Sequence, residues 1–258
     1  ERFGKPQTAQ LLEWNNTPAP AFARVNTLKT SNLDLQQRWE AERVCFEPAQ
    51  FDWIPEGTLF KLHDFPPLSS LPSFQEGGFY IQDPSTLLSV HLLAPESGEA
   101  ILDLCAAPGG KTTYIAQRIQ NTGRILAQDL DPARLQLVAE NARRLGVTCI
   151  STNPTPDSVF DRILVDAPCS NTGVMRRRVE LRLRIQPEEI ARLARTQIQL
   201  LRSAARHLRL GGVLLYSTCS LEREENEAVV REFLAAQPDF KLDLERSLTP
   251  FRDGVDGA

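Results

Sequence analysis

The chain has 258 residues, which is long enough for one large domain and a smaller one. Of these residues 41% are hydrophobic and 24% are charged, a composition typical of a globular protein. No apolar run approaches the roughly 18–20 residues needed to cross a bilayer, so we expect no membrane span. The net charge of −4 is unlike that of most proteins held on a phosphate backbone, although a local basic surface can still bind nucleic acid.

The cysteines bear on metal and redox chemistry. Five of them stand at positions 45, 105, 149, 169 and 219, with no C-x-x-C pair among them. This odd number and spacing argue against a disulfide framework and against zinc, and the three scattered histidines add no metal site. The chain opens without a signal peptide or an initiator Met. We therefore expect reduced thiols in an internal fragment of a longer cytoplasmic protein.

Residues 1–75 are rich in proline and irregular, with strand-like runs at Ala21–Thr27 and Thr58–Leu62 around a helical stretch, Asn32–Glu42. They predict a small α+β domain. From about residue 76 strands and helices alternate, which predicts a second, α/β domain over 76–258 with a mostly parallel sheet and helices on both of its faces.

The second domain holds a regular series of elements. Its predicted strands are Ala100–Cys105, Gly123–Asp129, Asp161–Asp166 and Gly212–Cys219, with an edge strand at Phe240–Leu244. Four helices are predicted in this domain. The first begins at Lys111, the second runs from Asp131-Pro132 to Gly146, and the other two cover Pro187–Leu208 and Glu222–Ala236. Asp131 followed by Pro132 is a typical N-cap and first helical residue.

A glycine-rich loop follows the first of these strands. In an open α/β sheet ligands bind beyond the carboxyl ends of the strands. The small residues there allow a ligand close to the backbone, although they fit neither a dinucleotide fingerprint nor a P-loop, and a tight strand–helix connection would also explain them. The loop reads Cys105-Ala106-Ala107-Pro108-Gly109-Gly110-Lys111.

Asp129 ends the second strand, where a carboxylate can accept both hydroxyls of a ribose. Asp131 competes for this role, but as an N-cap it already has a structural one. A pocket that recognises ribose without cradling phosphates indicates S-adenosylmethionine as the cofactor.

Two cysteines, Cys169 and Cys219, follow predicted central strands at the same edge of the sheet. A cysteine is commonly a small buried hydrophobe, which is our interpretation of Cys45 and Cys149. Cys169 and Cys219 instead lie in polar turns. A thiolate that adds to carbon 6 of cytosine makes carbon 5 able to attack a sulfonium methyl, and a second thiol can help to resolve the adduct. The residues alone do not decide which cysteine is the nucleophile.

Several motifs, in this order and spacing, resemble the Sun family of RNA cytosine-5 methyltransferases. They are Leu102–Thr112, Val165–Ser170, Tyr216–Ser220 and Glu224-Glu225-Asn226, preceded by Arg24–Thr27 and Tyr80–Pro84. The resemblance extends over roughly residues 11–257, and Leu12–Asn16 is most similar to the bacterial ribosomal-RNA branch.

This resemblance implies a Rossmann-like S-adenosylmethionine methyltransferase sheet, preceded by a small domain of the RNA-binding type. It implies that Cys219 is the nucleophile and that Cys169 assists product release. Cofactor contacts are implied for the glycine-rich loop, Asp129 and Asp166.

The chain departs from the family pattern at several places. Asn153 stands where the family often has an Asp near the adenine, so its contact with the cofactor is a weaker expectation. Ser170-Asn171-Thr172-Gly173 replaces the more usual Ser-Gly-Thr-Gly, and Arg178-Val179-Glu180 replaces His-Pro-Asp, which weakens the inference about substrate contacts. After Gly254–Ala258 the family's last strand is expected, but the sequence stops there.

RNA must present an unpaired or flipped base to a thiol and a methyl donor. We therefore expect phosphate contacts by Arg176 and Arg177, which follow the Cys169 loop, and by Arg24 and Asn26 in the small domain. A solvated arginine-rich turn is the alternative interpretation.

The expected partner is RNA, and the resemblance favours ribosomal RNA over transfer RNA. Other hypotheses are a small-molecule or protein methyltransferase of the same fold and a catalytically silent RNA-binding assembly factor. We expect no metal, no membrane partner and a monomer.

Overall fold

The computed structural model describes residues 2–153 and 158–258. Contacts divide the chain into two compact units. The sheet unit comprises Pro20–Leu164 and His207–Leu215, and the cysteine unit comprises the segment up to Ala19 together with Val165–Arg206 and Tyr216–Ala258. The chain passes between the two units four times: after Ala19, within strand β8 (Phe160–Asp166), after Arg206, and within strand β9 (Leu208–Ser217).

The first part of the sheet unit is an antiparallel sheet in the strand order β2-β3-β1-β4. Its strands and helices are β1 (Ala21–Val25), α2 (Asn32–Ala41), β2 (Cys45–Pro48), β3 (Leu59–Asp64), the 3₁₀ helix η1 (Leu68–Ser70), α3 (Pro72–Gln75) and β4 (Phe79–Ile81). Trp39 is fully buried at its centre, with the rings of Phe46, Phe60 and Phe79 at 5.1–5.5 Å. This aromatic cluster is the core of the small α+β region that the sequence predicts.

The predicted domain boundary between residues 75 and 76 stays a prediction. Helix α3 ends at Gln75, and β4, the fourth strand of the antiparallel sheet, follows it at Phe79–Ile81.

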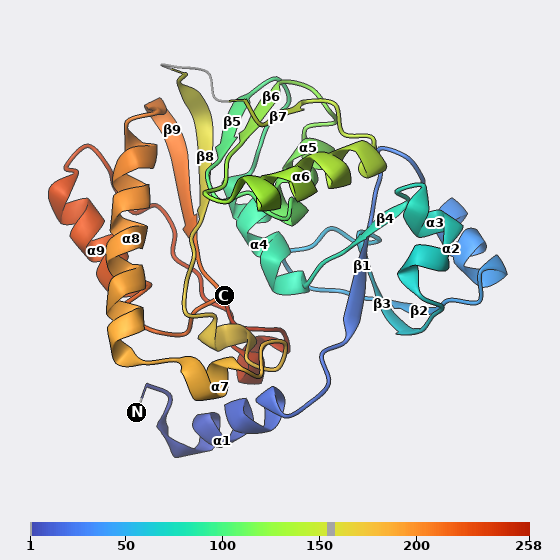
Figure 1. The fold of residues 1–258 in the computed structure, drawn as a ribbon, viewed down its shortest axis with the longest axis horizontal. Coiled ribbons are helices and arrows are strands. Elements are labelled where there is room, and N and C mark those ends of the chain that lie inside the picture. Colours follow the sequence, from blue (N-terminus) through green and yellow to red (C-terminus); the bar gives the residue numbers. More distant parts are fainter. Residues whose placement is uncertain (1, 154–157) are drawn as a thin grey trace. The chain divides into compact units, whose positions relative to one another are not determined.

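The second sheet has five strands in the order β7-β6-β5-β8-β9. The pairings β7–β6, β6–β5 and β5–β8 are parallel, which confirms the predicted α/β class. The remaining elements of this part are α4 (Pro84–Leu93), β5 (Ala100–Asp103), α5 (Gly110–Arg118), β6 (Arg124–Ala127), α6 (Pro132–Leu145) and β7 (Ile150–Ser151). Helices α4, α5 and α6 pack in succession beside the sheet (Figure 1).

Helix α6 has the limits that its sequence predicts. The Asp131 side chain accepts the Ala133 N–H at 2.9 Å, and Pro132 opens the helix. Gly146 ends it in a left-handed conformation, with φ +70°. Asp131 is therefore an N-cap, as expected.

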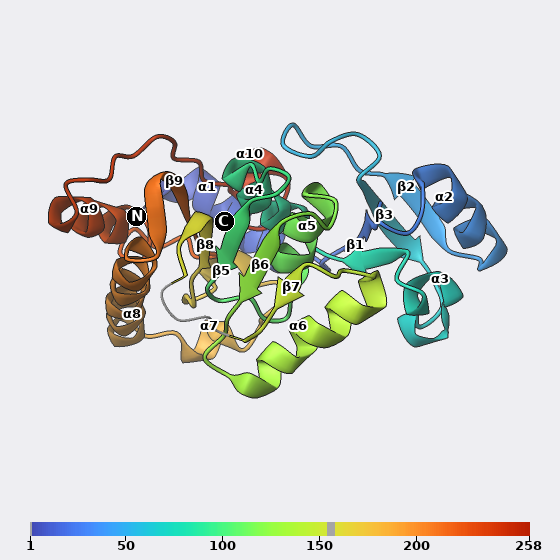
Figure 2. The same ribbon diagram turned by 90° about the horizontal axis from the view of Figure 1, so that it is seen from above.

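The cysteine unit is mainly helical. Its elements are α1 (Gly4–Asn15), the 3₁₀ helix η2 (Thr172–Val174), α7 (Leu181–Arg184), α8 (Pro187–Ala205), α9 (Glu227–Ala236) and α10 (Pro250–Asp253). Helix α8 packs against α9, and the two lie side by side in both views (Figure 1, Figure 2).

The predicted edge strand at Phe240–Leu244 is wrong, since this segment has no regular structure. Phe240 packs edge-on against Phe233 of α9 with ring centroids 5.1 Å apart, while Leu242 and Leu244 stay exposed. The segment is held by this ring contact with α9, and no strand pairing is described for it. Helix α9 also begins later than predicted, at Glu227, because Arg223–Asn226 form turns.

Within residues 2–153 and 158–258, no helix combines the length and apolar character required to span a membrane. The same part of the chain contains no group of three or more His, Cys, Asp or Glu side chains placed to hold a metal ion.

Candidate functional site

The glycine-rich loop joins β5 to α5, and its backbone is tightly folded. The Gly109 N–H donates to the Ala106 carbonyl at 2.7 Å, and Gly109 has φ +102°. A Cβ atom at Gly109 would lie 3.2 Å from Cα of Val138 on α6, closer than nearly all real Cβ contacts. The positive φ favours glycine here, and the absence of a Cβ atom lets the loop pack closely against α6.

Asp129 lies directly against this loop. Its carboxylate accepts the Ala107 N–H at 3.2 Å and the Asp131 N–H at 3.1 Å, and Arg134 lies 3.8 Å away. The Asp129 side chain is only 7% exposed. A carboxylate offers about four lone-pair positions, so acceptor capacity remains for a ligand's hydroxyl groups. The structure thus brings Asp129 and the glycine-rich loop together, as the sequence predicts.

Other side chains fix the loop, and sequence reasoning did not assign them. Arg134 donates to the Ala107 carbonyl at 3.1 Å, and Asn141 donates to the Pro108 carbonyl at 2.9 Å. Buried Asp103 accepts the Thr112 hydroxyl at 2.7 Å, which ties the end of β5 to the first turn of α5. Of these residues only Asp103 and Thr112 belong to the motif that carries the family resemblance.

Two residues predicted to bind RNA are buried in the sheet unit. The Arg24 guanidinium donates to the Gly110 carbonyl at 2.8 Å and to Thr113 Oγ1 at 3.1 Å, and it also bonds Gln82. It lies between the rings of Tyr80 and Tyr114, at 5.3 and 4.9 Å. Burial lowers the pKa of Arg24 to about 10. Arg24 therefore holds the glycine-rich loop in place and has no exposed surface for a phosphate.

Asn26 is likewise 2% exposed. Its Nδ2 donates to the carbonyls of Gly77 and Leu145, at 2.7 and 2.8 Å. The expectation that Arg24 and Asn26 contact RNA is thus corrected, because both side chains are buried and donate to groups inside the sheet unit.

Asn153 is exposed just after β7, and its backbone N–H donates to Ser151 Oγ at 3.3 Å. No described hydrogen bond joins it to the glycine-rich loop. Its predicted contact with a cofactor stays a prediction.

In the cysteine unit the two predicted catalytic cysteines meet. The Cys169 and Cys219 Sγ atoms lie 3.2 Å apart, and the Cys219 backbone N–H donates to Cys169 Sγ at 3.3 Å. Cys169 is buried, whereas Cys219 is half-buried. The prediction that Cys45 is a buried hydrophobe is wrong, since it is exposed in β2. Cys149 is half-buried, and burial raises the pKa of its thiol, which fits an inert cysteine.

Asn171 connects the two cysteines. It adopts a left-handed conformation, with φ +59°, which Asn tolerates better than most residues. Its Nδ2 donates to the Cys169 carbonyl at 2.7 Å, and its Oδ1 accepts from Cys219 Sγ at 2.9 Å.

Beneath the cysteines, Glu225 holds the two loops together. Its carboxylate is fully buried and accepts the Ser170 N–H at 2.9 Å, the Ser220 hydroxyl at 2.5 Å and Gln197 Nε2 at 3.0 Å. The Ser170 hydroxyl also bonds it. Each cysteine is thus followed by a serine anchored on one carboxylate. Glu225 belongs to the motif Glu224-Glu225-Asn226, but the sequence alone predicted no role for it.

Asp166 is the last residue of β8, and Tyr216 is the next-to-last residue of β9. Asp166 accepts the Ser217 hydroxyl at 2.8 Å, and the Tyr216 hydroxyl donates to the Glu225 carbonyl at 2.6 Å. Burial, together with the nearby acidic groups Cys169, Glu225 and Asp166, raises the pKa of Tyr216 well above its usual range. Tyr216 therefore remains a neutral hydrogen-bond donor near the cysteines.

The predicted phosphate contacts Arg176 and Arg177 both bind the buried carboxylate of Asp256, at 2.5 and 2.6 Å. The Arg176 side chain is 3% exposed and lies 3.9 Å over the ring of Trp14, whose Nε1 also donates to Asp256. The expectation for Arg176 is thus corrected: its guanidinium is enclosed by an ion pair and an aromatic ring. Arg177 is 33% exposed, and its RNA contact stays a prediction.

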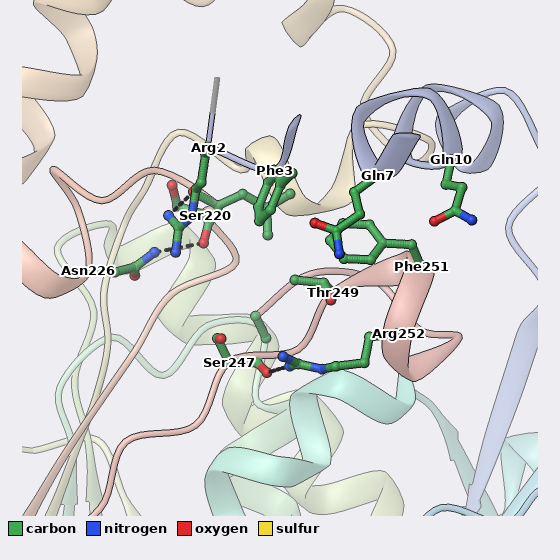
Figure 3. A pocket seen from close by; sticks show the side chains of 12 residues that line it. Arg2, Phe3, Gln7, Gln10, Ser220, Asn226, Ser247, Thr249, Phe251 and Arg252 are labelled. Atoms are coloured by element: carbon green, nitrogen blue, oxygen red, sulfur yellow. Dashed lines mark hydrogen bonds between the residues drawn. The ribbon is translucent and has the colours of Figure 1, made fainter. Parts of the chain in front are cut away.

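A separate pocket of about 400 Å³ lies in the cysteine unit (Figure 3). Arg2 reaches toward Ser220 and Asn226 there, and it pairs with Glu227 at 2.9 Å. None of the predicted site residues lines this pocket, so it is distinct from the cysteine pair.

Comparison with known proteins gives a consistent result. Residues 90–253 match the model of the family described as 16S rRNA methyltransferase RsmB/F. The probable ribosomal RNA small subunit methyltransferase B of Bacillus subtilis is 37% identical over 98% of this chain. The mouse 28S rRNA (cytosine-C(5))-methyltransferase is 40% identical over 89% of it.

The chain spans 59% of the Bacillus subtilis protein and 30% of the mouse protein. Among solved structures, the crystal structure of NSun6 from Pyrococcus horikoshii with SFG is similar to this chain, with a TM-score of 0.83 and 25% sequence identity. The match covers 99% of this chain and 93% of the NSun6 chain.

Proposed function

This chain belongs to the RsmB/F family of 16S rRNA methyltransferases, and we propose on that premise that it methylates carbon 5 of a cytosine in ribosomal RNA. The observation that carries the proposal is the Cys169–Cys219 pair, with sulfur atoms 3.2 Å apart. A methyltransferase acting on an ordinary nucleophilic atom needs no such pair, whereas carbon 5 of cytosine must first be activated by a thiolate.

Cys219 is the nucleophile in this proposal. It is half-buried, whereas Cys169 is buried, so a substrate base can reach the Cys219 thiol more readily. Its thiolate adds to carbon 6, the carbon 5–carbon 6 double bond opens, and carbon 5 bonds the incoming methyl group. Loss of the carbon 5 proton then restores the double bond as the Cys219 thiolate leaves.

Cys169 acts in the second half of this reaction, in which the Cys219 adduct is resolved. Its sulfur accepts the Cys219 N–H and lies against Cys219 Sγ, so it can exchange a proton close to the reacting sulfur. Buried thiols are poor nucleophiles toward a bulky base, which fits an assisting role.

The cofactor is S-adenosylmethionine, which supplies the methyl group. The residues of the sheet unit fit it: the glycine-rich loop folds tightly against α6, and the Asp129 carboxylate beside it retains acceptor capacity for ribose hydroxyls. The structural relative NSun6 was solved with SFG, an analogue of this cofactor. We assign the whole predicted set to cofactor binding, Cys105 to Lys111, Asp129, Asn153 and Asp166.

The substrate is ribosomal RNA in this proposal because both relatives are named for it. Transfer RNA is the second candidate. We further propose that the protein acts as a monomer in the cytoplasm.

One experiment tests the function directly. The protein is incubated with methyl-labelled S-adenosylmethionine and total RNA, and the RNA is fractionated and digested to nucleosides. Label in 5-methylcytidine from ribosomal RNA supports the proposal. Label in the transfer RNA fraction favours the second candidate, and cofactor binding without label indicates a silent assembly factor.

A further inference from the structure

The Cys219 thiol faces the side-chain amide of Asn171. The Cys219 Sγ to Asn171 Oδ1 distance is 2.9 Å, and the same amide donates through Nδ2 to the Cys169 carbonyl at 2.7 Å. Asn171 stands where the family more usually has glycine. This chain therefore carries a polar group on the nucleophilic sulfur that a glycine could not supply.

The two contacts of the amide fix its orientation. A backbone carbonyl has only lone pairs to offer, so the group 2.7 Å from the Cys169 oxygen must be the NH₂ of Asn171. The reversed amide would set two acceptor oxygens against each other. The oxygen of the amide must therefore face Cys219.

An amide oxygen can accept a hydrogen bond but cannot donate one. It binds a protonated thiol, and it repels a thiolate, which carries negative charge and no proton. The Asn171 contact thus favours the neutral form of Cys219 in the resting protein, although the reaction requires the thiolate. Another titratable group that faces Cys219 is the Cys169 thiol, with its sulfur 3.2 Å from Cys219 Sγ.

We propose that Asn171 holds Cys219 as a neutral thiol until the substrate base enters, which makes it a positioning residue for the nucleophile. The inference deepens the proposed function and rests on Cys219 being that nucleophile. On activation the Sγ–H···Oδ1 bond breaks, the proton passes to solvent, and the electron pair stays on sulfur for addition to carbon 6.

The test measures the thiol itself. The probe is iodoacetamide, and the rate of Cys219 alkylation is followed by mass spectrometry from pH 6 to pH 10. Asn171→Gly keeps the left-handed backbone, because glycine adopts a positive φ without strain. We expect this variant to react roughly 2- to 10-fold faster at pH 7, the effect of one hydrogen bond, with the midpoint of the pH–rate profile at lower pH.

Asn171→Asp supplies the opposite change. A carboxylate in place of the amide repels the thiolate more strongly, so alkylation at pH 7 should be slower than in the wild type. The matched control is Asn121→Gly. Asn121 also has a left-handed backbone, with φ +58°, but its amide donates to the Gly146 carbonyl in the sheet unit. Cys219 reactivity should be unchanged in this control.

A faster reaction of Asn171→Gly at every pH, with an unmoved midpoint, would show that the amide merely blocks access and would overturn the inference. Equal rates in wild type and variant would overturn it as well. The proposed function is judged separately, by methyl transfer to RNA. A wild type that methylates no RNA but shows the shifted midpoint in Asn171→Gly would refute the function alone.

Discussion

Glu225 accepts the backbone N–H of Ser170 at 2.9 Å, across 55 residues of chain. Because the same carboxylate accepts the Ser220 hydroxyl at 2.5 Å, one buried group sets the positions of the loops after both cysteines. The spacing of the two sulfur atoms therefore depends on Glu225, which bonds the serine that follows each cysteine.

Replacing Glu225 by Ala should destabilise the protein strongly. The variant leaves the buried donors of Ser170, Ser220 and Gln197 without their acceptor, and each unsatisfied donor costs about 1–3 kcal/mol. Glu225→Gln keeps one acceptor oxygen and should lose less. Urea unfolding measures the difference. Glu224→Ala is the matched control, because Glu224 is exposed and its loss should change stability by less than about 0.5 kcal/mol.

The roles of the cysteines can be separated by trapping. Cys219→Ala should abolish methylation and leave S-adenosylmethionine affinity nearly unchanged, because this thiol forms the bond to the base. Cys169→Ala should accumulate a covalent protein–RNA adduct, visible as a band of reduced mobility in a denaturing gel. An adduct in Cys219→Ala and none in Cys169→Ala would reverse the two roles.

Asp129→Ala should weaken S-adenosylmethionine binding by about 1–3 kcal/mol, measured by calorimetry. The loss has two sources, since the ribose loses an acceptor and the Ala107 N–H loses its partner in the loop. Asp131→Ala is the control: it removes the N-cap of α6 and should cost about 1 kcal/mol of stability. Weaker cofactor binding by the Asp131 variant, with normal binding by the Asp129 variant, would move the ribose contact to Asp131.

Sequence reasoning predicted the features that follow from local patterns. The parallel sheet, the cap of α6 at Asp131 and the meeting of Cys169 with Cys219 all follow from periodicity, capping chemistry and strand ends. Each is a property of a short segment or of the edge that parallel strands share. The edge strand at Phe240–Leu244 failed because pairing depends on a neighbour that the segment itself does not specify.

Partners distant in the chain could not be predicted. Arg24 and Arg176 look like phosphate ligands in a sequence, but their environments are set by Gly110 and Thr113 in one case and by Trp14 and Asp256 in the other. Asp256 lies 80 residues from Arg176, and no local pattern joins them. Burial of an arginine is a tertiary property, which explains why the RNA contacts were the weakest part of the prediction.

The two arginines on Asp256 should now behave differently. Arg176 is 3% exposed, and Asp256 keeps Arg177 and Trp14 Nε1 as donors when Arg176 is removed, so Arg176→Ala should lower stability by about 1–3 kcal/mol. Arg177 is 33% exposed and lies eight residues after Cys169 in the sequence. Arg177→Ala should therefore cost less stability and should lower RNA affinity at low salt.

An RNA titration at several salt concentrations checks this assignment. If Arg177 neutralises one phosphate, the slope of log affinity against log salt should fall by about 0.7–0.9 in the variant, with S-adenosylmethionine binding unchanged. Arg192→Ala is the matched control, since Arg192 is 58% exposed on α8 and pairs with Glu189 at 2.6 Å. Equal slopes for wild type and the Arg177 variant would leave Arg177 a solvated partner of Asp256, and the phosphate contacts would then have to come from other arginines, such as Arg178, which is 58% exposed.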